Sequence, residues 1–552
     1  MARINDIFCF LWTIMTVEIN IAIALTGRSG CSDVKLAYGN AGGVSPNEVP
    51  TYAIPGDDLR ICSSSYSCCT SKMVNELADI AEQDFKDKIR DETSMLRDYF
   101  VRRTQKFDDY MKRLIAVSQQ DLNGMFLTTY GEMYRENDAL FMDLFTSLRN
   151  YYFGIEIDLE QVMDDFFFVL FQKMFALLNV DYEYTSSFWM CTGNYMEELM
   201  PFENIPQKLT LQIRRSLTAA RTFVQGLGIG RDVVTDISKV DPSQSCKDAL
   251  TRLSQCASCN GHTWVPPCYS FCQNVMKGCL SSEVELQQEW YKYVAAMSSL
   301  SDRLEGPFNV QAVLSSIDLE ISNGIMSMQE MAPVISPKVM EGCGPLPSKR
   351  SKRSDRSRSR TPIKKTSNQR TYAAVTAESL SVDFRRLLKD VKKKLKEWER
   401  IWSGLSYQVC NDPNVAAPTV EEENCWNGET VGSYTHEQVG QGISDQQTNP
   451  EVIVDLTKPN FMVRKQITKL RTITQQLKNA VEGKDADWID TEYASGSGSG
   501  SGSGYGDSLD DVQVEDPKYR PTVEPPEGTG AHTLASWSCL FVFLLVSLIL
   551  RW

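Results

Sequence analysis

A run of five Ser-Gly dipeptides near the end of the chain offers the most specific chemistry in the sequence. It spans residues 495–504, and its hydroxyl groups belong to Ser495, Ser497, Ser499, Ser501 and Ser503. Acidic residues flank the run at Asp485, Asp487, Asp490, Glu492, Asp507, Asp510 and Asp511. Taken alone, such a repeat is a flexible spacer. Xylose transfer to serine needs an exposed hydroxyl on a small, extended backbone near acidic residues, so we predict that these serines start glycosaminoglycan chains.

A basic segment in the middle of the chain carries a signal for proteolysis. Ten Lys or Arg residues and one acidic residue lie between positions 349 and 370, and three prolines fall within 345–372. This composition predicts a disordered loop rather than a helix. The loop contains the cations Arg350, Lys352 and Arg353. Their R-x-K-R spacing fits the acidic pockets of subtilisin-like proprotein convertases, so we predict cleavage after Arg353; the alternative is a loop that only binds polyanions.

Catalytic groups are scarce. The chain has three histidines, His262, His436 and His532, and no Ser/His/Asp order or paired-carboxylate pattern stands out. The glycines of Gly226-x-Gly228-x-Gly230 follow a helical pattern and no strand, so they predict a helix end and a turn rather than a phosphate loop. A formal charge of -14 argues against a nucleic-acid binder. We therefore predict no enzyme, no catalytic residue and no cofactor.

Both ends of the chain read as targeting signals. Apolar stretches over 7–17 and 19–25, with small residues at Ala22 and Ala24, predict a secretory signal peptide over 1–24, the alternative being a signal anchor. The apolar run 540–550 is too short to span a bilayer. Small residues and a short spacer precede it, which predicts a glycosylphosphatidylinositol (GPI) signal, attachment at Gly528 and removal of 529–552. The alternative is a tail-anchored helix.

An extracellular location favours disulfides over free thiols. Cys9 and Cys539 fall in the segments predicted to be removed, which leaves fourteen of the sixteen cysteines, an even number. The alternative is a zinc site, because Cys256-x2-Cys259 and Cys268-x3-Cys272 imitate a zinc-ribbon spacing. Disulfides are the preferred interpretation, no metal is predicted, and spacing alone cannot give the pairing.

Helical periodicity dominates the elements that would position these sites. Residues 56–200 contain no proline, and apolar residues from Leu77 to Leu114 recur at intervals of three and four residues. This pattern predicts one long helix or two helices in line. Further helices are predicted over 166–180, 209–224, 284–304, 382–402 and 467–481. Basic residues crowd 385–400, where they could bind anionic polysaccharide or membrane, although a solvated helix face is the commoner outcome. The body is therefore predicted to be all-α and elongated.

Five local stretches resemble one family. They read LRICSSSYSCCT from Leu59, AARTFVQGL from Ala219, NVMKGCL from Asn274, RLEGPFN from Arg303 and CWNG from Cys425. Together with the cysteines, the basic loop, the Ser-Gly run and the tail, they resemble the glypicans, and within them the dally-like branch. The resemblance covers the chain from about Cys31 to the tail.

The resemblance implies an elongated, multi-helix, disulfide-rich core over 25–481, followed by a disordered acidic stalk over 482–528. It also implies seven disulfides: Cys31 with Cys68, Cys62 with Cys256, Cys69 with Cys259, Cys191 with Cys343, Cys246 with Cys279, Cys268 with Cys425, and Cys272 with Cys410. The last two would join the halves across the convertase cut.

The function implied by the resemblance is that of a GPI-anchored heparan sulfate proteoglycan on the outer face of the plasma membrane, or shed from it. Such a protein would be a co-receptor that captures Wnt, Hedgehog, bone morphogenetic protein (BMP) and fibroblast growth factor (FGF) ligands for their receptors. No Asn-x-Ser/Thr sequon occurs, so N-glycans are not expected. The main alternative is a GPI-anchored receptor that binds ligand through its cysteine-rich core without glycosaminoglycan; an extracellular hydrolase is a distant third.

Overall fold

The computed structural model describes residues 30–41, 45–344, 346–348, 370–421 and 423–485. The chain divides into two compact units, 1–496 and 497–552, and all described residues belong to the first. The predicted boundaries at 24 and 528 lie outside the described residues, so they remain predictions.

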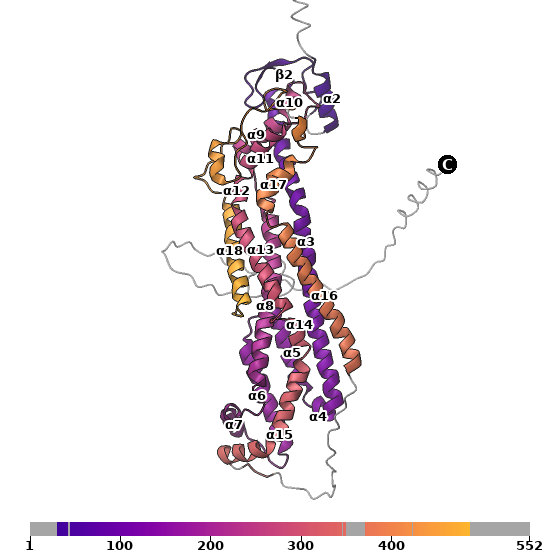
Figure 1. Ribbon diagram of the computed structural model, residues 1–552, viewed down its shortest axis with the longest axis vertical. Helices are drawn as coiled ribbons and strands as arrows, with labels where there is room; N and C mark the ends of the chain where they lie inside the picture. Colours follow the sequence, from indigo (N-terminus) through magenta and orange to yellow (C-terminus); the bar gives the residue numbers. More distant parts are fainter. Residues whose placement is uncertain (1–29, 42–44, 345, 349–369, 422, 486–552) are drawn as a thin grey trace, which may run out of the picture. The chain divides into compact units, whose positions relative to one another are not determined.

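Helices make up most of the described chain, and the predicted all-α class is confirmed (Figure 1). The helices are α2 (Ser32–Ala41), α3 (Ser71–Tyr130), α4 (Glu132–Arg135), α5 (Asp138–Tyr152), α6 (Leu159–Leu178), α7 (Ser186–Leu199), α8 (Ile205–Ile237), α9 (Gln244–Ser254), α10 (Cys256–Cys259), α11 (Tyr269–Cys279), α12 (Ser281–Val284), α13 (Leu286–Glu305), α14 (Val310–Leu314), α15 (Ile317–Cys343), α16 (Arg370–Glu397), α17 (Ile401–Cys410) and α18 (Phe461–Val481). Two 3₁₀ helices, η1 (Thr419–Glu421) and η2 (Ile443–Thr448), and one antiparallel pair of strands, β1 (Ile54–Gly56) and β2 (Ser64–Ser67), complete the described elements.

Helix α3 is the longest of these elements. The Thr70 hydroxyl caps its first turn by accepting a hydrogen bond from the Met73 amide at 3.3 Å. The helix ends at Tyr130 and is followed by Gly131, whose φ of +57° favours glycine. With 60 residues at about 1.5 Å of rise each, α3 is about 90 Å long. The sequence left one helix or two in line open, and the structure has one.

Two apolar clusters lie along α3. We call the first the cysteine-rich end; it is built from α2, the chain next to β1 and β2, α9, α10, α11, the end of α17 and the first turns of α3, up to Ile89. We call the second the helical bundle; it begins at Leu96 of α3 and includes α5, α6, α8, α13, α15, α16 and α18. Figure 1 shows these long helices running lengthwise beside α3. One continuous helix thus connects both clusters.

The glycines of α8 correct one prediction. Gly226, Gly228 and Gly230 do not end the helix after Val224; they lie buried inside α8, which continues to Ile237. A Cβ at position 230 would come within 2.5 Å of the Tyr293 hydroxyl and 2.7 Å of the Phe100 ring. Gly226 and Gly230 therefore allow α13 and α3 to pack directly against α8, and the buried contacts outweigh the helix-breaking tendency of glycine.

The remaining helix predictions are confirmed with shifted ends. The apolar stretch 166–180 lies in α6, where Phe167, Phe171 and Phe175 are fully buried. The stretch 382–402 is divided between α16 and α17, because the helix stops at Glu397 and restarts at Ile401. The stretch 467–481 forms the second part of α18.

Candidate functional site

Seven disulfides hold the described chain, in the same pairs that the glypican resemblance implied. They are Cys31–Cys68, Cys62–Cys256, Cys69–Cys259, Cys191–Cys343, Cys246–Cys279, Cys268–Cys425 and Cys272–Cys410. The four cysteines with zinc-ribbon spacing belong to four different disulfides, so they are not free thiolate ligands. Among the described residues no group of three His, Cys, Asp or Glu could hold a metal ion.

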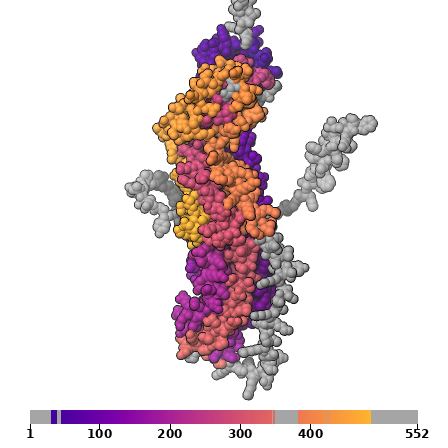
Figure 2. All heavy atoms as spheres, in the orientation of Figure 1, coloured from indigo at the N-terminus to yellow at the C-terminus, as the bar shows by residue number. Residues whose placement is uncertain are grey.

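Two disulfides cross the basic segment in sequence. Cys268 and Cys272, one turn apart at the start of α11, are bonded to Cys425 and Cys410, which follow that segment. The backbone reinforces the link, since the Cys268 amide donates to the Trp426 carbonyl at 2.8 Å. In Figure 2 the orange and yellow surface of residues beyond 370 lies directly beside the magenta surface of earlier residues. The two parts are therefore joined by covalent bonds and by packing.

The predicted cleavage residues Arg350, Lys352 and Arg353 lie outside the described residues, but both flanks are described. On the amino-terminal side, α15 ends at Cys343, which is disulfide-bonded to Cys191 of α7. On the carboxyl-terminal side, α16 begins at Arg370. Its later turns are anchored in the bundle by side chains that are almost fully buried, among them Leu388 and Leu395.

The predicted attachment residues, Ser495, Ser497, Ser499, Ser501, Ser503 and Gly528, also lie outside the described residues. The element before them is α18, which packs Leu470, Ile473 and Leu477 into the bundle and ends at Val481. Another Ser-Gly dipeptide is described: Ser403 sits in the first turn of α17, and its hydroxyl donates to the Arg400 carbonyl at 3.2 Å. A helical, internally bonded serine does not offer the extended acceptor that xylose transfer needs.

The two histidines within the described residues do not form a catalytic arrangement. His262 lies in the turn after α10, and His436 packs edge-to-face with Tyr434, their ring centroids 5.4 Å apart. The Tyr434 hydroxyl donates to Glu451 at 2.9 Å and accepts from the Asn274 amide at 3.0 Å, so it serves the packing of the loop.

The sequence does not indicate that one titratable group, Glu283, is buried. Glu283 of α12 is 6% exposed, and one of its carboxylate oxygens has no hydrogen-bond partner among the described residues. Burial raises its pKa to about 7. Nothing in its local sequence, Ser-Ser-Glu-Val-Glu, distinguishes it from a surface carboxylate, because the burial comes from packing against α17 and η2, far away in the chain.

A groove between α3 and α16 gathers basic side chains. Its volume is about 830 Å³, and its walls carry the cations Arg103, Lys106, Lys112, Arg113 and Arg386 and the carboxylates Asp109, Asp383 and Asp390. We call it the basic groove. It contains part of the basic segment 385–400, for which the sequence allows either polyanion binding or a solvated helix face.

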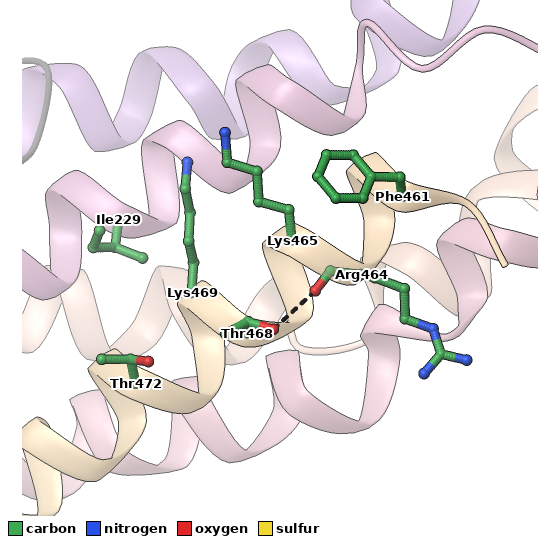
Figure 3. A pocket seen from close by; sticks show the side chains of 7 residues that line it. All are labelled: Ile229, Phe461, Arg464, Lys465, Thr468, Lys469 and Thr472. Carbon is green, nitrogen blue, oxygen red and sulfur yellow. Dashed lines mark hydrogen bonds between the residues drawn. The ribbon is translucent and has the colours of Figure 1, made fainter. Parts of the chain in front are cut away.

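A second cationic surface lies on α18. Arg464, Lys465 and Lys469 line a shallow groove of about 470 Å³ against α8, beside the exposed ring of Phe461. Figure 3 shows that Lys465 and Lys469 point to one side of the helix while Arg464 points away from them. Lys469 is also paired with Asp236 at 3.1 Å. These cations do not converge on one point.

An apolar pocket opens at the other end of the bundle, among α3, α4, α5, α6 and α15. Its lining includes the rings of Phe126, Tyr134 and Phe141 and the partly exposed side chains of Met133 and Leu177. Met133 and Leu177 are 45% and 43% exposed, so apolar surface reaches solvent here. No described helix is long and apolar enough to cross a membrane.

Comparison with known proteins gives one consistent answer. The glypican family model matches residues 13–535. Glypican-1 of Gallus gallus is 35% identical over 526 residues, 93% of this chain and 92% of the relative, and glypican-2 of Homo sapiens is 34% identical over 481 residues, 85% and 81% of the two chains.

Solved structures agree with this result. A crystal structure of C-terminally truncated glypican-1 has a TM-score of 0.73 at 31% identity, covering 83% of this chain and 99% of its own. A structure of Dally-like protein in complex with O-palmitoleoyl serine has a TM-score of 0.61 at 30% identity, with the same coverage. The resemblance found in the sequence is confirmed, and the chain belongs to the glypican family, whose members are cell-surface heparan sulfate proteoglycans.

Proposed function

We propose that this glypican is held at the outer face of the plasma membrane by a GPI lipid on Gly528 and carries its heparan sulfate on the Ser-Gly run. As a co-receptor it captures Wnt, Hedgehog, BMP and FGF ligands and presents them to their receptors or restrains them. One observation carries this proposal: five Ser-Gly dipeptides with acidic flanks begin at Ser495, shortly after the bundle ends at Val481.

Electrostatics explains why the chains rather than the core would capture ligand. The formal charge of -14 is spread over 552 residues, so the protein alone offers basic growth factors only a low density of negative charge. Sulfated chains add a dense line of negative charge that acts over a Debye length of about 8 Å at physiological salt. Several contacts along one chain then add avidity.

Proteolysis after Arg353 fits the same proposal. The cut would leave a two-chain core, because Cys268–Cys425 and Cys272–Cys410 join the two parts. Its flanks are fixed by α15 and α16, so the change would be confined to the basic segment.

Release from the membrane by phosphatidylinositol-specific phospholipase C tests the anchor.

The decisive experiment removes the acceptor hydroxyls. Replacing Ser495, Ser497, Ser499, Ser501 and Ser503 with Ala should turn a heparinase-sensitive, high-mass smear into one sharp band and remove most binding of a heparin-binding growth factor. Ser403→Ala is the matched control, since Ser403 also precedes glycine but lies in α17. A smear that persists in the five-serine variant would contradict the assignment of the attachment sites.

A second candidate function is direct binding of an acyl group by the core. The apolar pocket among α3 to α6 and α15 favours it, because apolar side chains of its lining, such as Met133 and Leu177, are exposed to solvent. Dally-like protein, whose structure is similar, was solved in complex with O-palmitoleoyl serine. We propose the same ligand class for this pocket.

Titration with O-palmitoleoyl serine tests this second candidate. Leu177→Glu places a carboxylate in the lining and should abolish saturable binding. Met142→Glu is the control, because Met142 is 54% exposed on α5 and does not line the pocket. Equal binding by both variants would refute the acyl-binding function and leave the glycosaminoglycan function untouched.

A further inference from the structure

The basic groove is built by regular spacing on two packed helices. Arg103, Lys106, Tyr110 and Arg113 of α3 are separated by three, four and three residues, so they share one face of that helix. Arg386 of α16 faces them from across the groove. The groove therefore collects cations from segments about 280 residues apart in sequence, a convergence that neither helix shows alone.

Aromatic packing holds the two helices together beside and beneath the groove. The rings of Tyr110 and Phe384 are stacked with centroids 4.8 Å apart, and those of Tyr99 and Trp398 meet edge-to-face at 5.3 Å. Tyr110 and Phe384 are almost fully buried. The spacing of the cations is thus set by a rigid support rather than by flexible side chains alone.

The floor also presents a hydrogen-bond donor without a partner. Tyr110 is 2% exposed and lines the groove, and its hydroxyl has no hydrogen-bond partner among the described residues. Burial, followed by the charge of Asp383, raises the pKa of Tyr110, so the hydroxyl keeps its proton. A buried hydroxyl without a partner is costly, and an acceptor oxygen entering the groove would satisfy it.

The carboxylates in the lining do not cancel the positive charge of the basic groove. Asp390 is already neutralised, because it pairs with Arg103 at 2.7 Å and accepts from the Tyr99 hydroxyl at 2.7 Å. The lining then has two further carboxylates, Asp109 and Asp383, and four further cations, Lys106, Lys112, Arg113 and Arg386. The lining has five cations and three carboxylates in all, in a chain that is otherwise acidic.

From these observations we propose that the basic groove of the core binds a segment of sulfated polysaccharide. Sulfate oxygens accept hydrogen bonds and carry negative charge, which matches a lining of Arg, Lys and one protonated Tyr. A flat anionic membrane cannot reach a donor at the floor of a groove between two helices. The inference goes beyond the proposed function, because it assigns to the protein core a polysaccharide site of its own.

The acidic stalk of this chain is the weaker occupant. It spreads twelve acidic and three basic residues over positions 482–527, so its negative charges are far apart. A sulfated polymer carries anionic groups on every repeat and can follow the exposed cations of α16 beyond the groove, at Lys389 and Lys393. Several simultaneous contacts along one polymer favour that occupant.

The test uses the full chain with the five Ser-Gly serines replaced by Ala, so that no attached polysaccharide competes. A heparin dodecasaccharide is titrated against this protein at several salt concentrations. The groove variant Lys106→Gln, Arg113→Gln, Arg386→Gln should bind about tenfold more weakly and with a smaller salt dependence, because fewer counterions are exchanged on binding. Tyr110→Phe, which keeps the ring and removes the hydroxyl, should weaken binding without changing the salt dependence.

The cationic surface on α18 supplies the matched control. Arg464→Gln, Lys465→Gln, Lys469→Gln removes the same number of charges from the same body (Figure 3), but its cations do not converge, so we expect a change of at most about twofold. Equal losses in the two triple variants would mean that only net charge matters, and would overturn the proposal. Unchanged binding by the groove variant would overturn it as well.

Two further arms identify the occupant. If the stalk were the stronger occupant, the dodecasaccharide would bind measurably only after Asp507→Asn, Asp510→Asn, Asp511→Asn, and that result would overturn the proposal. Amide hydrogen exchange over 100–113 and 383–396 then separates two sources of the polysaccharide. Protection that heparinase removes from the intact proteoglycan supports binding of its own chains, whereas protection that needs added dodecasaccharide supports binding of chains from other molecules. Because the variants lack attached chains, failure of the groove would not bear on the attachment sites.

Discussion

The cysteine-rich end and the helical bundle are stabilised in different ways. Six of the seven disulfides belong to the cysteine-rich end, where α9, α10, α11 and α17 have eleven residues or fewer. The bundle has one disulfide, Cys191–Cys343, and its core is rich in aromatic rings on helices of up to 60 residues. Short segments bury too little apolar surface to hold one another, so covalent links take that role. Long helices can rely on packing.

The first way to test this comparison is to cut the covalent links between the two parts of the chain. After cleavage at Arg353 and reduction in native buffer, we expect both fragments to elute together from a sizing column. The reason is that α16, α17 and α18 bury eleven large apolar side chains against the rest of the bundle. They are Phe384, Leu388, Val391, Leu395, Ile401, Trp402, Val463, Ile467, Leu470, Ile473 and Leu477.

Such burial contributes roughly 20 kcal/mol before the entropic cost of association is subtracted. Denaturing gels should give one band without reductant and two with it, and Arg350→Ala with Arg353→Ala should give one band under both conditions. Fragments that separate in reductant without denaturant would show that the disulfides, rather than the packing, join the bundle.

A matched pair of tryptophans tests, at single residues, whether packing or disulfides stabilise each region. Trp290 in the bundle and Trp426 at the cysteine-rich end are both fully buried, and each donates its indole N–H to a carbonyl, of Trp398 at 3.0 Å and of Arg252 at 2.9 Å. We expect Trp290→Ala to lower the free energy of unfolding by about 5 kcal/mol. For Trp426→Ala we expect about 3 kcal/mol, because the neighbouring Cys268–Cys425 disulfide still holds the loop.

Chemical denaturation of both variants measures the difference, with the exposed Trp264→Ala as a control that should change little. Reduction should enlarge the effect of Trp426→Ala and leave that of Trp290→Ala nearly unchanged. The reverse order would contradict the division of roles between disulfides and packing.

Sequence reasoning reached the helices of this fold because apolar residues recur at helical spacing over long stretches, as in α3. It failed at α8, where Gly226, Gly228 and Gly230 suggested a helix end. The structure explains the failure: the missing Cβ atoms make room for α13 and α3, and a single sequence does not contain that contact.

The candidate sites also fall into two groups, those that the sequence could predict and those that it could not. Attachment and cleavage signals are short linear motifs, so the sequence alone could suggest them. The basic groove and Glu283 could not be predicted, because Arg103 meets Asp390, and Glu283 is buried, only after distant segments pack together. The seven disulfide pairs came from the family resemblance and not from the spacing of the cysteines.

A buried carboxyl gives a smaller, pH-dependent test. Glu283 lies where α12 packs against α17 and η2, and its pKa in the folded chain is about 7, above its ordinary value of 4.5 because burial disfavours the charged form. The folded chain thus binds this proton more tightly than the unfolded chain. The stability it contributes is fully present below pH 4.5 and is lost as the pH rises through 7.

Glu283→Gln removes that charge and keeps the size of the side chain. We expect the variant to be more stable than the parent by about 3 kcal/mol at pH 7.4 and by about 1 kcal/mol at pH 5. Thermal unfolding at the two pH values measures the change, and Glu132→Gln on an exposed site should have no comparable effect. If the difference in stability between variant and parent does not decrease on acidification, the charge of Glu283 is not its cause.

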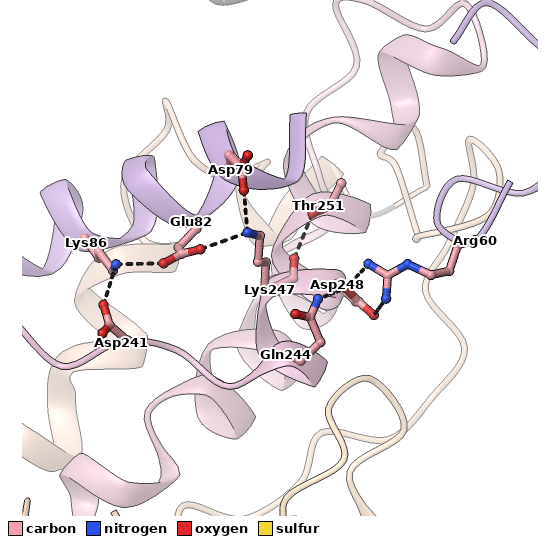
Figure 4. Close-up of polar contacts among 9 residues, drawn as sticks. All are labelled: Arg60, Asp79, Glu82, Lys86, Asp241, Gln244, Lys247, Asp248 and Thr251. Carbon is pink, nitrogen blue, oxygen red and sulfur yellow. Dashed lines mark hydrogen bonds and ion pairs between the residues drawn. The ribbon is translucent and has the colours of Figure 1, made fainter. Parts of the chain in front are cut away.

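The smallest expected effect concerns the ion pairs between α3 and α9 (Figure 4). Glu82 accepts from Lys86 at 2.7 Å and lies 3.0 Å from Lys247, and Lys247 also reaches Asp79 at 2.5 Å. Hydrogen bonds from Lys86 and then Lys247 lower the pKa of Glu82, so its contribution is present above pH 4.5 and lost as the pH falls through the lowered value.

Glu82→Gln should cost at most about 1 kcal/mol at neutral pH and low salt, because the pairs are partly exposed and solvent screens them. The loss should shrink at high salt and disappear at low pH, as urea denaturation at two salt concentrations can measure. Glu76→Gln, at a looser pair 3.6 Å from Lys72, is the matched control and should cost still less. The neighbouring disulfides Cys62–Cys256 and Cys69–Cys259 already hold α10, directly after α9, to the chain that leads into α3. A loss of several kcal/mol would therefore mean that ion pairs, and not disulfides, hold the cysteine-rich end together.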